Sequence, residues 1–105
     1  MLGVRVTITR FVDEYQPGWV ECSLTDAWGK LWLFVEKVPV VADTALDSRS
    51  EYPQPGVIAC EIAGKQRDSD GREVITIDTA KPWYVEATTG EVRFDVLPEQ
   101  LTEWE

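Results

Sequence analysis

Alternation of apolar and polar residues is the strongest pattern in the chain. The segment "VRVTITRFV" at residues 4–12 places valine and isoleucine at every second position, and residues 20–24 repeat the pattern with Cys22 at the centre. A period of two with β-branched residues predicts half-buried strands. The intervening "DEYQPG" supplies Pro17 and Gly18, which favour a turn. We therefore predict a hairpin that carries Cys22 into the core.

A third strand is predicted at residues 30–38, and it is apolar on both faces. One face carries Leu31, Leu33 and Val35, and the other carries Trp32 and Phe34. We expect Leu33 and Val35 to face the core on the same side as Cys22. The Trp32 and Phe34 face is then either covered by another element or is a surface for a partner.

Further strands are predicted at residues 56–62 and 72–79, and a last hairpin at residues 83–96 around "TTG". In the final residues, Leu97, Leu101 and Trp104 follow helical spacing, and Pro98 suits a first helical position. The sequence therefore predicts one all-β domain over residues 1–105. We expect a small antiparallel barrel or two-layer sandwich of about six or seven strands, built as a meander of hairpins with a short C-terminal helical turn.

Two parts of the chain resemble each other. Gln-Pro-Gly precedes a cysteine by the same interval at residues 16–22 and 54–60, and an Asp-x-x-Gly turn follows at residues 26–29 and 68–71. Duplication of one hairpin explains this pattern. Chance also explains it, because both motifs are common turn signals in all-β chains.

The charge balance narrows the class of partner. The 105 residues carry a formal net charge of −9, and the last twenty hold six acidic residues against Arg93 alone. Because nucleic-acid affinity depends on Lys and Arg, we expect no nucleic-acid partner. No apolar run is long enough to cross a bilayer, so we expect no membrane partner and a cytoplasmic location.

The chemistry available to the chain is limited. There is no histidine, which removes the usual general base near neutral pH. Cys22 and Cys60 lack the spacing of a redox pair or zinc site and are expected to be core residues. "DSDGRE" at residues 68–73 is better explained as a turn than as a calcium loop. We expect no cofactor, no metal and no catalysis; a carboxylate enzyme is the weakest of three functional hypotheses.

Aromatic residues give the best indication of a binding site. Five tryptophans are many for this length, and Trp and Tyr dominate binding hot spots. We predict a monomeric or weakly homodimeric interaction module (an inhibitor, immunity-type or adaptor protein) for a protein with a basic surface. The alternative is a β-barrel that binds a small molecule at a tryptophan-lined site. The predicted partner-binding residues are Trp19, Trp28, Trp32, Phe34, Glu91 and Asp95.

Overall fold

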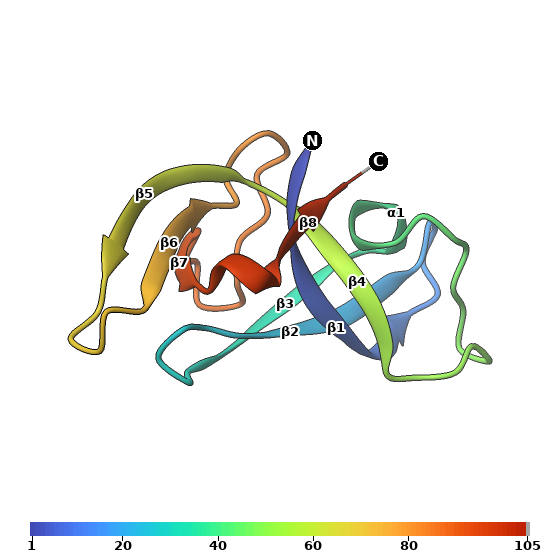
Figure 1. Cartoon of the computed structure of the whole chain (residues 1–105). Coiled ribbons are helices and arrows are strands. Elements are labelled where there is room, and N and C mark those ends of the chain that lie inside the picture. The colour runs from blue at the N-terminus through green and yellow to red at the C-terminus, as the bar shows by residue number, and fades with distance from the viewer. Residues whose placement is uncertain (105) are drawn as a thin grey trace.

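The structure is a computed structural model that describes residues 1–104. It is a sandwich-like all-β fold of two antiparallel sheets and not a closed barrel, which confirms the all-β prediction (Figure 1). The larger sheet contains β1 (Leu2–Asp13), β2 (Trp19–Thr25), β3 (Leu31–Lys37), β4 (Gln54–Ala59) and β8 (Leu101–Glu103). The smaller sheet contains β5 (Glu61–Arg67), β6 (Glu73–Asp78) and β7 (Arg93–Val96).

β1 organises the larger sheet, whose strand order is β3-β2-β1-β4. Its C-terminal half pairs with β2 as the predicted hairpin, and β4 lies along its other edge. β8 pairs with the first residues of β1, from Leu2 to Val4. The beginning and end of the described chain therefore lie side by side (Figure 1).

The two sheets are joined by a nearly continuous strand. β4 ends at Ala59 and β5 begins at Glu61, with only Cys60 between them. The core between the sheets is made mostly of valine and isoleucine side chains together with Phe34 and Phe94, and Cys22 and Cys60 are 0% and 1% exposed. Both thiols are free, so the prediction that they are core residues is confirmed.

The orientation predicted for β3 is wrong. In the β2–β3 hairpin Cys22 lies opposite Phe34 and Leu24 lies opposite Trp32, so these four share the inward face. Phe34 is completely buried, whereas Val35 is 39% exposed. The turn at residues 26–30 determines this register, because the amide of Asp26 donates to the carbonyl of Lys30.

The last third of the chain also differs from the elements predicted from the sequence. The turn at "TTG" is present, since Ala87 donates to the carbonyl of Glu91, but residues 79–92 contain no strand. β7 pairs with β6 instead. The predicted C-terminal helical turn is the 3-10 turn η1 (Pro98–Gln100), and the residues after it form β8. The only other helix among residues 1–104 is α1 (Val38–Val41), after β3.

The two similar parts of the chain have the same structure at their Asp-x-x-Gly turns but not at their Gln-Pro-Gly segments. Asp26 and Asp68 cap matching turns, in which the carboxylate accepts the amides two and four residues later at 2.8–2.9 Å. Gly18 forms a turn with a φ of 93°, whereas Gly56 lies within β4 opposite Val6. The Gln-Pro-Gly segments therefore have different roles.

Candidate functional site

Four of the six predicted site residues meet where the β2–β3 turn contacts the smaller sheet. The indole Nε1 of Trp28 donates to Asp95 Oδ2 at 3.0 Å, and Thr76 Oγ1 donates to Asp95 Oδ1 at 2.6 Å. The rings of Trp32 and Phe34 each pack edge-on against Phe94, with centroids 5.1 and 5.5 Å away. We call Trp28, Trp32, Phe34 and Asp95 the junction cluster.

The two matched turns are also joined at this junction. Arg72, which follows the second turn, donates to the carbonyl of Ala27 at 2.9 Å, and its guanidinium lies 6.0 Å from the ring of Trp28. The amide of Ala27 donates to the carbonyl of Asp95 at 2.8 Å. These contacts hold the sheets together, and within the cluster only Trp28, at 53% exposed, presents a large area to solvent.

The other two predicted residues lie elsewhere. Trp19 begins β2, opposite Lys37, whose ammonium lies 5.7 Å from the indole ring. Glu91 is exposed in the loop before β7. The structure therefore does not bring the six residues onto one surface, because Phe34 and Trp32 face inward and Trp19 lies at the opposite end of the hairpin from Trp28.

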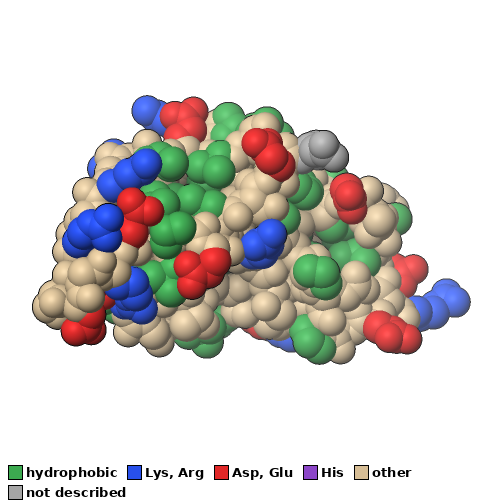
Figure 2. Space-filling view, viewed as in Figure 1, with side chains coloured by type: hydrophobic (Ala, Val, Ile, Leu, Met, Phe, Trp, Pro, Cys, Tyr) green, Lys and Arg blue, Asp and Glu red, His purple; other side chains and the backbone are tan. Residues whose placement is uncertain are grey.

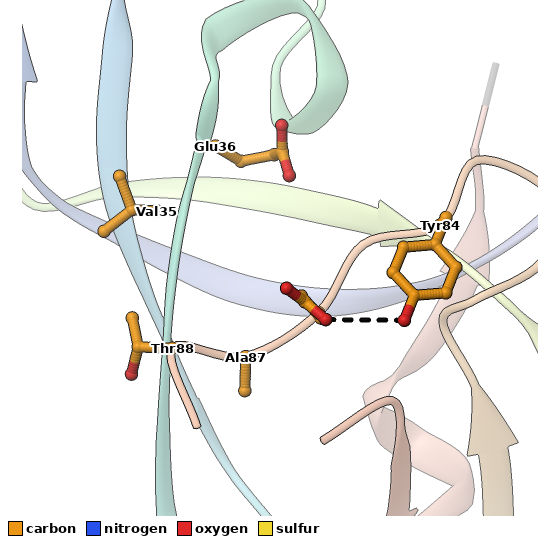
Figure 3. Close-up of a pocket in the computed structure, with 6 residues that line it drawn as sticks. Val35, Glu36, Tyr84, Ala87 and Thr88 are labelled. Atoms are coloured by element: carbon orange, nitrogen blue, oxygen red, sulfur yellow. Dashed lines mark hydrogen bonds between the residues drawn. The ribbon is translucent and has the colours of Figure 1, made fainter. Parts of the chain in front are cut away.

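A different feature combines exposed aromatic and acidic side chains. A surface hollow of about 390 Å³ lies between β3 and the segment 84–88, and we call it the β3-edge groove. Its lining residues are Val35, Glu36, Tyr84, Glu86, Ala87 and Thr88 (Figure 3). Tyr84 is 61% exposed, and its hydroxyl donates to Glu86 Oε2 at 3.4 Å.

The backbone at Tyr84, in the wall of this groove, has an unusual conformation. Its φ of 53° is in the left-handed region, and Tyr84 is the only non-glycine residue among residues 1–104 with a positive φ. Such conformations cost free energy and occur disproportionately at functional sites. One indication of this site is visible in the sequence, because Glu86 opens the acidic C-terminal region, but no pattern shows that the 84–88 segment lies beside β3.

The cysteines do not provide a nucleophile. Burial in the apolar core raises the pKa of Cys22 to about 12, with a smaller contribution from the negative charges of Glu36 and Glu21. Burial raises the pKa of Cys60 to about 11. Both thiols are therefore protonated near neutral pH, and only a thiolate attacks or binds metal well.

Among residues 1–104, no group of three or more Cys, Asp or Glu side chains is arranged to hold a metal ion. No helix in this part of the chain has the length and hydropathy needed to span a membrane.

An apolar hollow of about 550 Å³ lies beside Cys60 and Ile62, near the smaller sheet. Hydrophobic side chains are visible on the surface over that sheet in Figure 2. No tryptophan lines this hollow, so it does not match the tryptophan-lined site of the small-molecule hypothesis.

No protein-family model, curated protein or solved structure matches this chain.

Proposed function

We propose that this protein is a non-catalytic interaction module that binds a partner protein through a basic surface on that partner. The β3-edge groove carries the proposal, because it combines two glutamates with an exposed tyrosine at the edge of a sheet. Carboxylates attract Lys and Arg and speed encounter, and a tyrosine ring provides contact area at low entropic cost. The net charge of −9 supports the same partner chemistry.

The remaining properties fit an adaptor or inhibitor. The two cysteines are free and buried, which is compatible with a reducing compartment. We therefore propose that the protein binds its partner in the cytoplasm. The protein would act as a monomer or weak homodimer, with the groove open to its partner.

Affinity capture with paired variants tests the proposal. The wild-type protein should retain a basic protein at low ionic strength and release it at high salt, because rim charges are screened. Glu36→Gln with Glu86→Gln should abolish retention. Glu14→Gln with Glu51→Gln removes the same charge from exposed positions outside the groove and should retain the protein.

Equal retention by both double variants would show that net charge alone is responsible and that the groove is not the binding site. Failure to retain any basic protein under conditions where all variants are folded would contradict the function itself.

A further inference from the structure

β3 is an outer strand of the larger sheet, and its free side is only partly covered. In an antiparallel pair the N–H and C=O of one residue point to the same side, and every second residue points the same way. The carbonyl of Leu33 points outward, since it accepts the amide of Thr88 at 2.8 Å. The N–H and C=O of Val35 therefore also point outward, on the side away from β2.

The β3-edge groove begins where the 84–88 segment no longer contacts the outer side of β3. Thr88 supplies the one loop hydrogen bond to the outer side of β3 between residues 31 and 37, within the described residues 1–104. Beyond it the segment 84–88 and β3 are separated by the β3-edge groove, with Val35 and Glu36 on one wall and Tyr84 on the other (Figure 3). The unpaired backbone of Val35 thus faces a hollow with acidic and aromatic walls.

A second outer strand shows how this protein protects an edge. β5 carries Glu61, Lys65 and Arg67, all exposed, and its pairing with β6 is interrupted by a bulge between Ile62 and Gly64. Charges and bulges are the usual means of preventing strand addition.

On its outward face β3 carries one such charge, Lys37 at its C-terminal end, whose ammonium lies over the ring of Trp19, and its pairing with β2 has no bulge. That face carries a row of apolar side chains, with Leu31 57% and Val35 39% exposed. Peptide-binding sheets take up an extended segment at such an exposed edge, with main-chain hydrogen bonds for affinity and pockets for alternate side chains for specificity.

We propose that an extended segment of the partner adds to β3 beside Val35 and places an arginine side chain between Glu36 and Glu86, against the ring of Tyr84. This inference rests on the proposed function and specifies its partner chemistry. Alternate residues of an added strand point to opposite faces. A residue opposite Val35 extends the apolar row, while its neighbour points toward Glu36 on the inner face. Arginine suits that position because its planar guanidinium binds carboxylates and stacks on aromatic rings.

A short peptide tests this arrangement directly. The probe is acetyl-TVRVT-amide, titrated into the 15N-labelled protein and followed through amide shifts. We expect saturable shifts at Val35, Glu36 and residues 84–88, with binding weakened about tenfold or more when glutamine replaces the probe's arginine. The Glu36→Gln/Glu86→Gln variant should lose binding to a similar extent, and the Glu14→Gln/Glu51→Gln control should not.

Two further peptides separate this inference from the general function. If N-methylation of the three central amides abolishes binding, backbone pairing is supported; if it leaves binding unchanged, strand addition is wrong although charge recognition stands. Replacement of the probe's arginine by lysine should weaken binding, and equal affinity would overturn the preference for arginine. If the protein captures a basic partner but the probe causes no shift at Val35 or Tyr84, this inference alone is overturned. If the protein captures no basic partner and the probe causes no shift, the proposed function is overturned as well.

Discussion

Asp95 is the residue whose removal should best reveal how the two sheets are held together. Its carboxylate accepts one hydrogen bond from Trp28 across the junction and one from Thr76 on β6, at 3.0 and 2.6 Å. Hydrogen bonds to charged groups contribute roughly 1.5–3 kcal/mol each. Because Trp28 is 53% exposed and Asp95 is only partly buried, water screens both bonds, and each contributes about 1–1.5 kcal/mol here. Asp95→Ala should therefore lower the free energy of unfolding by about 2–3 kcal/mol.

Urea denaturation followed by tryptophan fluorescence measures this loss. For a domain of this size the denaturation midpoint should fall by about 1–3 M, given a slope of about 1–2 kcal/mol per M. Trp28→Phe removes only the indole donor and should cost about 1 kcal/mol. In the double variant the two losses should not add, because both single changes remove the same bond.

A nearby acidic residue provides the control. Glu91 is exposed, and among residues 1–104 its side chain has no hydrogen bond or ion pair. Glu91→Ala should change stability by less than about 0.5 kcal/mol. If Asp95→Ala is no more destabilising than Glu91→Ala, or if its loss adds fully to that of Trp28→Phe, then the Trp28–Asp95 contact does not stabilise the junction.

Three other predictions concern local features. A Cβ added at Gly56 would lie 2.8 Å from Ile8 Cγ1, whereas the nearest neighbour of a Cβ added at Gly64 is at 4.0 Å. Thermal melts should therefore show that Gly56→Ala lowers the free energy of unfolding by about 1–3 kcal/mol and that Gly64→Ala changes it little. Tyr84→Gly should raise the free energy of unfolding by up to about 1 kcal/mol by relieving the left-handed backbone while weakening partner binding, and a loss of stability would argue against strain there. Because the pKa values of both cysteines are raised in the folded protein, the unfolded chain loses its thiol protons at lower pH. The free energy of unfolding should therefore fall by about 1.4 kcal/mol per pH unit per thiol from pH 9 toward pH 11. Replacement of both cysteines by alanine should remove this slope.

The strands that alternate cleanly could be predicted from the sequence, and β3 shows why others could not. Where only one face is apolar, as in β1 and β2, the period of two also identifies the buried side. β3 is apolar on both faces, so the pattern allows either orientation. The orientation depends on the register set by the five-residue turn that begins at Asp26, and counting residues across that turn places Phe34 opposite Cys22.

The candidate site was less accessible to prediction for a related reason. Tyr84 and Glu36 are 48 positions apart and are brought together by tertiary contacts, among them the burial of Val85 and Ala87 and the hydrogen bond from Thr88 to Leu33. Residues 79–92 form no strand, so they have no periodicity that would indicate which edge they cover. Aromatic and acidic content indicated the kind of partner, and tertiary contact determines which residues are available to it.

The pairing of β8 with β1 has a consequence for the order of folding. Leu2 lies opposite Glu103, so this contact closes a loop that includes almost the whole chain. Contacts so distant in sequence are slow to form, because the loop-closure entropy must be overcome before they stabilise the fold. We expect the β1–β2–β3 hairpins to form early and β8 to join last, so that β1 completes its pairing only when folding of the domain is nearly finished.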